Sequence, residues 1–214
     1  LREFLVMQIL FKDPKIEMGM FGRFVVRLFS YMAYGALAAM AVVLVFAELS
    51  WMEPLGLLIV LFLIDKLIHI NSGRKSLIED WGDGDLNLVD FLSPTCLALL
   101  EKTIDRGTFL GNDLAVAFLK EALDSGEASS FIKDKNLLTK TEKGVDEYLK
   151  SHTKGEVKTL EEVKRVLEGW VHEAALVAKG DGVLYIEPKY LFLKLKLGVN
   201  EEGALKFLGE LGII

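Results

Sequence analysis

A run of twenty residues without a charge, residues 28–47, constrains this chain more than any other feature. A helix that crosses a bilayer satisfies its backbone hydrogen bonds internally and needs about 20 mostly apolar residues for a hydrocarbon core about 30 Å thick. The run meets this requirement, and it is too long for a cleavable signal peptide. We therefore predict a transmembrane helix.

A second apolar run, residues 54–64, follows almost at once. It reaches spanning length, to about Ile70, only when Asp65, Lys66 and His69 lie near the membrane surface. A buried core helix or a re-entrant segment is the alternative for a run this short. The two runs predict a transmembrane helical hairpin over residues 24–70, preceded by a pre-membrane segment, residues 1–23, for which we expect an interfacial helix or a short strand.

The charges beside the two runs predict the orientation of the hairpin. The bases that flank it are Lys12, Lys15, Arg23, Arg27, Lys66, Arg74 and Lys75, whereas the connection, residues 48–53, holds two acids and no base. Cytoplasmic flanks are enriched in Lys and Arg. We therefore expect a protein of the cell (inner) membrane, in contact with membrane lipid, whose termini and soluble domain are cytoplasmic.

Most of the charged residues, which make up 26% of the chain, follow residue 70. The remaining residues suffice for one domain with its own core. We predict a linker over residues 71–91 and a helical domain over residues 92–214. The net charge of −6 argues against nucleic acid as a partner, because phosphate binding needs a basic face.

The sequence contains no motif that predicts catalysis or a cofactor. A nucleotide-binding P-loop is absent, and an acidic run, residues 80–87, lacks the Gly and Glu of an EF-hand calcium loop. The lone Cys96 and three histidines, His69, His152 and His172, make no zinc motif. We therefore expect no metal, no cofactor and no enzymatic activity in this segment.

From Leu92 onward, apolar residues recur at helical spacing, which predicts an all-α domain. Ser93 followed by Pro94 predicts one helix start, Asn112 another, and Thr159 with Glu162 three residues later forms a capping box. We expect the remaining helices at residues 129–137, within 139–158, from 188 and at 201–211.

The two halves of this domain resemble each other. Residues 110–119 and 186–195 have similar patterns 76 positions apart, and each is followed by a polar turn and a short helix. An internal duplication, with repeats at about residues 92–138 and 160–214, is the simplest account.

These repeats resemble the Clp repeat domain, the N-terminal domain of Clp-family AAA+ unfoldases. The resemblance lies in residues 166–168, 172–175, 186, 190–193 and 200–213 of the second copy, and in 111–114, 118–119, 124–128 and 135–137 of the first. It implies two pseudo-symmetric helical repeats that receive substrate proteins or adaptors ahead of an ATPase ring, with Asp113, Phe118, Lys189 and Tyr190 as binding residues. Some members bind phosphorylated arginine through a Glu in each cap. The resemblance matches these two positions with Asp113, which keeps the carboxylate, and Lys189, which reverses the charge.

The resulting hypothesis is a membrane-anchored substrate- or adaptor-recognition domain of a Clp-type ATP-dependent unfoldase or protease regulatory subunit. AAA+ ring modules would lie in the same polypeptide or in another chain, and the start at Leu1 suggests a fragment. The alternative is a free-standing membrane scaffold or sensor with the same protein-binding fold. A third hypothesis is a small homo-oligomeric channel or transporter that uses Asp65 and His69. It is less favoured because Asp65, Lys66 and His69 can instead extend to the headgroups and pair with each other, and because two helices enclose no pathway without oligomerisation.

Overall fold

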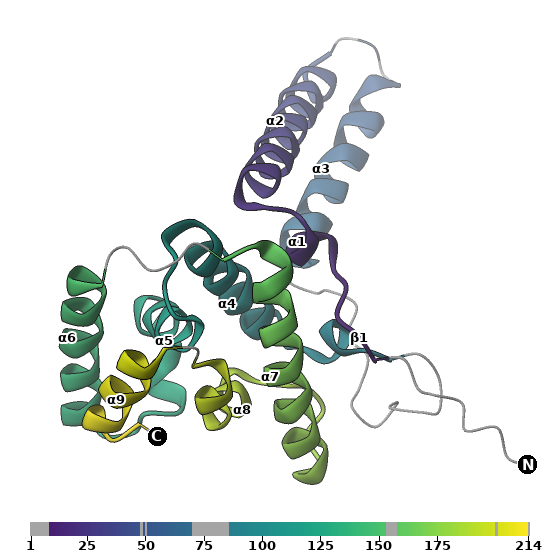
Figure 1. Ribbon diagram of the computed structural model, residues 1–214. Coiled ribbons are helices and arrows are strands. Elements are labelled where there is room, and N and C mark those ends of the chain that lie inside the picture. The colour runs from purple at the N-terminus through teal and green to yellow at the C-terminus, as the bar shows by residue number, and fades with distance from the viewer. Residues whose placement is uncertain are drawn as a thin grey trace, which may run out of the picture. The chain divides into compact units, whose positions relative to one another are not determined.

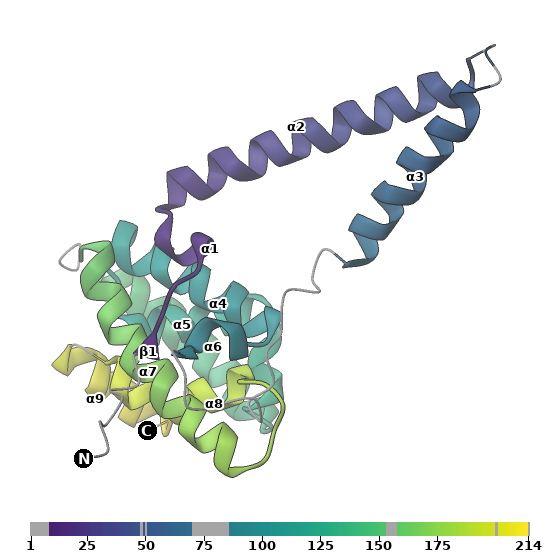
Figure 2. The same cartoon turned by 90° about the vertical axis from the view of Figure 1, so that its right-hand side faces the viewer.

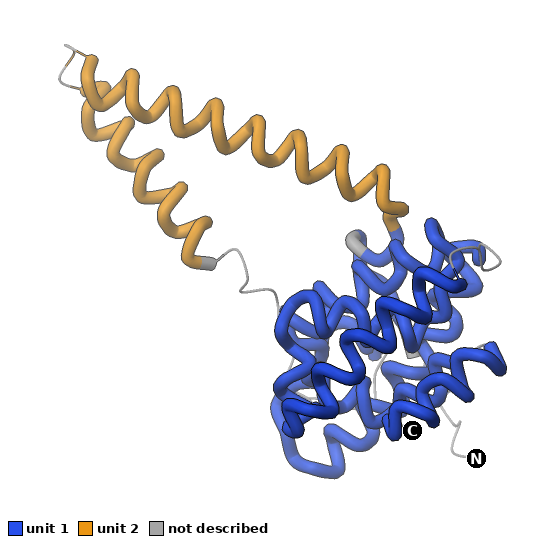
Figure 3. Tube along the Cα trace, turned by 90° about the vertical axis from the view of Figure 1, so that its left-hand side faces the viewer, with its two compact units in different colours: residues 1–17, 75–214 blue, residues 18–74 orange. Residues whose placement is uncertain are grey.

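The computed structural model describes residues 9–47, 49, 51–69, 86–152, 158–199 and 201–213. These residues are almost entirely helical, which confirms the predicted all-α class. They divide into two compact units, Met18–Arg74 and a larger unit made of Leu1–Glu17 together with Lys75–Ile214 (Figure 3). Each unit is described by itself.

The smaller unit consists of two helices, α2 (Met20–Val45) and α3 (Met52–His69) (Figure 1). At 1.5 Å per residue, α2 is about 39 Å long and α3 about 27 Å. The helices approach closely near their connection, where a Cβ on Gly56 would lie 2.8 Å from the backbone nitrogen of Val45. Figure 2 shows them separating away from this point.

The larger unit has one hydrophobic core built around its helices. Its α-helices are α1 (Pro14–Glu17), α4 (Pro94–Asp105), α5 (Leu114–Asp124), α6 (Lys135–Ser151), α7 (Leu160–Gly180), α8 (Pro188–Leu193) and α9 (Glu202–Leu211). Short helical turns occupy η2 (Leu88–Phe91), η3 (Arg106–Leu110), η4 (Glu127–Ser130) and η5 (Leu195–Gly198). Helix α5 is buried on nearly all sides, as expected for a helix that is apolar around its circumference.

Several predicted helix ends are confirmed. The Ser93 hydroxyl accepts a hydrogen bond from the Cys96 amide at 3.2 Å, and Thr159 and Glu162 form the capping box. Helix α9 ends at Gly212, whose φ of 76° favours glycine. The predicted cap of α5 was wrong by one residue, because its N-cap is Asp113 and not Asn112.

The prediction for residues 129–137 was wrong. A 3₁₀ turn, η4, ends at Ser130, and α6 starts only at Lys135, because Asp134 caps it by accepting hydrogen bonds from the amides of Asn136 and Leu137. The single helix α6 therefore covers most of residues 139–158, where one helix was expected. Gly155 also predicts a turn after this helix, and that position lies outside the described residues.

The order of elements repeats within the described part of the larger unit. The series α4, α5, η4, α6 is followed by α7, α8, η5, α9, each with two helices, a 3₁₀ turn and a third helix. The copies differ in length: α4 has 12 residues against 21 in α7, and α5 has 11 against 6 in α8. A π-helical turn, η3, extends α4 toward α5.

The N-terminal segment packs on the larger unit. Strand β1 (Ile9–Leu10) pairs in parallel with β2 (Leu86–Asn87), and Phe11 and Ile16 are buried in the core. The boundaries thus differ from the predicted ones, with a short strand and a four-residue helix where an interfacial helix was the first expectation. The end of the predicted linker also joins the core, through η2.

Candidate functional site

Residues on either side of the smaller unit are hydrogen-bonded to each other within the larger one. The amide of Lys12 donates to Oδ1 of Asn87 at 3.0 Å, and Nδ2 of Asn87 donates to the carbonyl of Lys12 at 2.8 Å. Together with the β1–β2 pairing, these bonds form what we call the clasp. Within the larger unit, a segment that precedes the smaller unit in the sequence is therefore held beside a segment that follows it.

Helix α2 exposes apolar side chains along most of its length. Among its large apolar residues, the exposed ones are Met20, Phe21, Phe24, Val26, Leu28, Phe29, Tyr31, Met32, Tyr34, Met40, Val42 and Val43. Of the described helices, α2 alone is long and apolar enough to cross a membrane by composition. Helix α3 is equally apolar through its middle but carries Glu53 near its start and Asp65 and Lys66 near its end.

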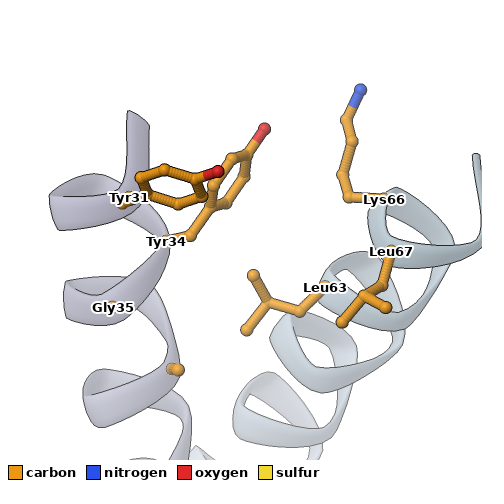
Figure 4. Close-up of a pocket in the computed structure, with 7 residues that line it drawn as sticks. Tyr31, Tyr34, Gly35, Leu63, Lys66 and Leu67 are labelled. Carbon is orange, nitrogen blue, oxygen red and sulfur yellow. The ribbon is translucent and has the colours of Figure 1, made fainter. Parts of the chain in front are cut away.

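A cleft lies between α2 and α3, with a volume of about 630 Å³. Its lining residues are Tyr31, Tyr34, Gly35, Ala38, Leu63, Lys66 and Leu67. Figure 4 shows both tyrosine rings extending from α2, with their hydroxyls on the side of the Lys66 ammonium, while Leu63 and Leu67 point toward α2. The cleft is therefore apolar with one polar end.

This cleft was not predicted from the sequence, which placed Lys66 near the membrane surface. The three-residue spacing of the tyrosines was the available signal, because it places both rings on one helix face. Nothing in the sequence showed that this face is opposite Lys66.

Asp113, the first predicted binding residue, has a structural role. Its carboxylate accepts hydrogen bonds from the amides of Ala115 at 2.9 Å and Val116 at 3.5 Å at the start of α5. The residue is only 2% exposed. It satisfies helix donors that would otherwise be unpaired, and it is not displayed to a partner.

Phe118 and Tyr190 are also interior residues. The Phe118 ring is fully buried and meets Trp170 edge-on, with ring centroids 5.0 Å apart. The Trp170 indole donates to the carbonyl of Leu191 at 2.8 Å, so one side chain of α7 joins the α5 and α8 regions. Tyr190 is 2% exposed, and burial is the main reason that its pKa is raised.

Lys189 lies at the surface, but it does not occupy the position equivalent to Asp113. The N-cap of α8 is Glu187, two residues earlier, so the predicted matching of Asp113 with Lys189 was wrong. The Lys189 ammonium lies 3.0 Å from the Glu187 carboxylate and 4.9 Å from the Tyr190 ring centroid. The ion pair with Glu187 raises the pKa of Lys189 and offsets the unfavourable helix dipole.

Ion pairs join the helices of the first repeat. Glu121, on α5, pairs with Arg106 and, at 3.6 Å, with Lys102. Lys120 lies 2.6 Å from Asp124 and 2.9 Å from Asp146 of α6. The hydrogen bond from Lys120 lowers the pKa of Asp146. These charged side chains of the first repeat are therefore paired with one another.

The second repeat exposes four leucines on neighbouring elements. Leu193 is 65% exposed at the end of α8, and Leu197 is 52% exposed in η5. Leu176 of α7 and Leu184, in the α7–α8 connection, are 46% and 47% exposed. We call these four residues the leucine patch. Exposed apolar side chains that gather into one patch mark protein-binding surfaces, which makes these leucines candidates for binding.

Cys96 is fully buried, and burial raises the pKa of its thiol, so it remains protonated at neutral pH. Within the described residues, no group of three or more His, Cys, Asp or Glu side chains is placed to hold a metal ion.

Comparison with protein-family models, with curated protein sequences and with solved structures gave no match.

Proposed function

We propose that this chain is a membrane-anchored protein-recognition module, with α2 and α3 as a transmembrane hairpin and the larger unit as the part that binds proteins. The observation that carries the proposal is the clasp, together with the apolar surface of α2. The clasp joins Lys12 to Asn87, and the exposed apolar helix α2 lies between these two residues in the sequence. An apolar segment inserted between two paired parts of a folded domain can anchor that domain in a membrane.

The clasp supports a hairpin over a single crossing. Lys12 and Asn87 belong to the same folded unit, so residues 18–74 begin and end on one side of any bilayer that they enter. If α2 crosses the bilayer, a second segment between α2 and Asn87 must therefore cross it in the opposite direction. Helix α3, about 27 Å long, is the available return segment, with Asp65 and Lys66 near the surface that the domain faces.

The side of the membrane follows from the flanking charges. Lys12, Arg23 and Arg27 precede the first crossing, Lys66 ends the second, and the connection is acidic. The excess of bases in cytoplasmic flanks favours a cytoplasmic domain, on the inner face of the cell membrane.

For the larger unit, we propose recognition of protein substrates or adaptors, as in the Clp repeat domain that the sequence resembles. The repeated order of helices supports this fold, and the leucine patch supplies an apolar surface. Because Asp113, Phe118 and Tyr190 are interior, we assign recognition to the leucine patch and to Lys189, which is four residues before Leu193. The AAA+ ring would be supplied by the same polypeptide or by another chain.

Topology is tested with single cysteines in inverted and right-side-out membrane vesicles. Cys96 is buried, so Trp51→Cys in the connection and Lys133→Cys in the domain are the reactive sites for a membrane-impermeant thiol reagent. A hairpin predicts that the two sites react from opposite sides. Reaction of both from one side, with α2 lying on the surface, would contradict it.

Recognition is tested with the full chain in lipid nanodiscs and a permanently unfolded, carboxymethylated protein as ligand. We expect Leu193→Ser with Leu197→Ser to weaken binding by about tenfold, because central apolar contacts dominate such interfaces. Leu205→Ser, at a 40% exposed leucine of α9, is the matched control and should change binding by less than about twofold. Equal effects of both changes would remove the leucine patch as the binding surface.

The alternative, a free-standing membrane scaffold or sensor, is separated by the mass of the native subunit. A subunit much heavier than 23.9 kDa that forms nucleotide-dependent hexamers would support the unfoldase. A subunit near that mass, without an ATPase partner, would favour the scaffold.

A further inference from the structure

We propose that the cleft between α2 and α3 binds one anionic phospholipid, with its phosphate at the Lys66 ammonium and an acyl chain against Leu63 and Leu67. This inference rests on the proposed insertion of the hairpin into a membrane. It adds a lipid preference to what would otherwise be a simple anchor.

The lining of the cleft matches the two halves of a phospholipid. One lysine ammonium and two tyrosine hydroxyls, from Tyr31 and Tyr34, lie on the same side and supply positive charge and donors for one phosphodiester. Gly35, Ala38 and the two leucines supply an apolar surface below them. The volume of about 630 Å³ is within the range of about 300–1,000 Å³ typical of small-molecule sites.

Tyr31 and Lys66 lie at one level along the hairpin, and Tyr34 is three residues closer to the connection. Tyr31 is 14 residues from Val45 (45 − 31), and Lys66 is 14 residues from Met52 (66 − 52), which places both about 21 Å from the connection. Lys66 is three residues from the end of α3 at His69, on the side from which the chain returns to the domain. This level lies inside a hydrocarbon core about 30 Å thick, and the long Lys66 side chain can extend from it toward the headgroups.

Small residues give the lipid room. A Cβ placed on Gly35 would have no heavy atom within 4 Å, in contrast to the tight contact at Gly56. The Lys66 ammonium is 6.0 Å from the Phe62 ring centroid, a weak contact that leaves it able to turn toward a phosphate. The helices thus meet near their connection, at Gly56, and leave a largely apolar cleft toward their other ends.

The experiment counts the phospholipids that remain on the full chain when it is released from nanodiscs for native mass spectrometry. The nanodiscs contain phosphatidylcholine with a minor fraction of phosphatidylglycerol, and we expect one phosphatidylglycerol to be retained. Lys66→Gln should lower the retained fraction about fivefold. The matched control is Arg27→Gln, which removes a charge that does not line the cleft and should leave retention within about twofold.

A second pair of variants tests the apolar part. Ala38→Leu fills the cleft and should abolish retention, whereas Ala36→Leu adds the same volume at a position that does not line it. The double change Tyr31→Phe with Tyr34→Phe should lower retention without altering the shape of the cleft.

Insertion is measured first, by resistance to alkaline carbonate extraction. A chain that does not insert overturns the proposed anchor and the lipid site with it. An inserted chain that retains no phosphatidylglycerol, or retains it equally after Lys66→Gln, overturns the lipid site alone. Displacement of the lipid by inorganic phosphate would identify a free-anion site and would also overturn it.

Discussion

Lys12 and Asn87, 75 residues apart in the sequence, exchange two hydrogen bonds, one in each direction, between the backbone of the first and the side chain of the second. The 57 residues of the smaller unit, 18–74, lie between them. The clasp therefore joins a residue that precedes the segment that we propose to enter the membrane to a residue that follows it.

We expect Asn87→Ala to lower the free energy of unfolding by about 1–2 kcal/mol, because two backbone groups of Lys12 lose their partner. Hydrogen exchange of the Lys12 amide should accelerate in the same variant. The control is Asn136→Ala, at an exposed residue of α6, which should change stability by less than about 0.5 kcal/mol. An unchanged Lys12 exchange rate would show that the clasp contributes nothing.

Asp113→Ala should destabilise the larger unit by about 1–2 kcal/mol through loss of the α5 cap. Asp113→Asn keeps the accepting oxygen and should cost less. Urea unfolding measures both, with Asp134→Ala at the exposed α6 cap as the comparison. If Asp113→Asn left stability intact and yet abolished protein binding, Asp113 would be a binding residue after all.

Trp170→Phe should cost about 2–4 kcal/mol, because it opens a cavity and removes the indole hydrogen bond, so that the Leu191 carbonyl keeps only the Lys194 amide as a donor. Phe118→Leu should couple to it by about 0.5–1.5 kcal/mol, the range of an edge-on aromatic pair. A double-mutant cycle in urea provides the measurement. Strict additivity would show that the two rings do not stabilise each other.

Gly56→Ala should destabilise the hairpin, since the new Cβ would be 2.8 Å from the Val45 backbone nitrogen and 3.0 Å from the Ala41 carbonyl oxygen. Gly35→Ala is the matched control, because its Cβ meets nothing within 4 Å. Thermal unfolding in detergent should show a lower midpoint for the first variant only. Equal midpoints would mean that the helices do not meet at Gly56.

Tyr148 should make stability sensitive to alkaline pH. Burial raises its pKa to about 12 from an ordinary value of 10.0, and among the described residues its hydroxyl has no hydrogen-bond partner. A raised pKa means that the folded state favours the protonated phenol, so this contribution is present below pH 10 and is lost as pH rises toward about 12.

The difference in unfolding free energy between wild type and Tyr148→Phe measures this contribution, since phenylalanine cannot ionise. The difference should be constant from pH 7 to 9. Above pH 10, the unfolding free energy of wild type should fall relative to that of Tyr148→Phe. At neutral pH the variant should be as stable as wild type or up to about 1 kcal/mol more stable, because it removes an unsatisfied hydroxyl. A difference that is flat to pH 12 would show that the phenol is not held in its protonated form.

Local chemistry made the helix ends of the larger unit predictable. The Ser93 cap, the Thr159–Glu162 capping box and the stop at Gly212 each depend on atoms within a few residues of one another. The long apolar run likewise predicts α2, because the length and hydropathy of a helix are properties of consecutive residues.

The candidate binding residues were harder to place. Periodicity showed that Phe118 and Tyr190 lie on apolar helix faces, but the same pattern describes an interior face and a binding face. Packing against Trp170, from another helix, decided that Phe118 is interior. The alignment of Asp113 with Lys189 failed because α8 is shorter than α5 and begins at a different point of the repeat.

The sequence by itself therefore determined the helical class, most of the helix caps and the apolar span, since all three follow from interactions between near neighbours in the chain. Only the tertiary structure decided that the N-terminal segment belongs to the larger unit, that Asn87 holds Lys12, and that Tyr31 and Tyr34 share a cleft with Lys66. These relationships join residues 32 to 75 positions apart (66 − 34 and 87 − 12), and no local pattern specifies which distant partners will meet.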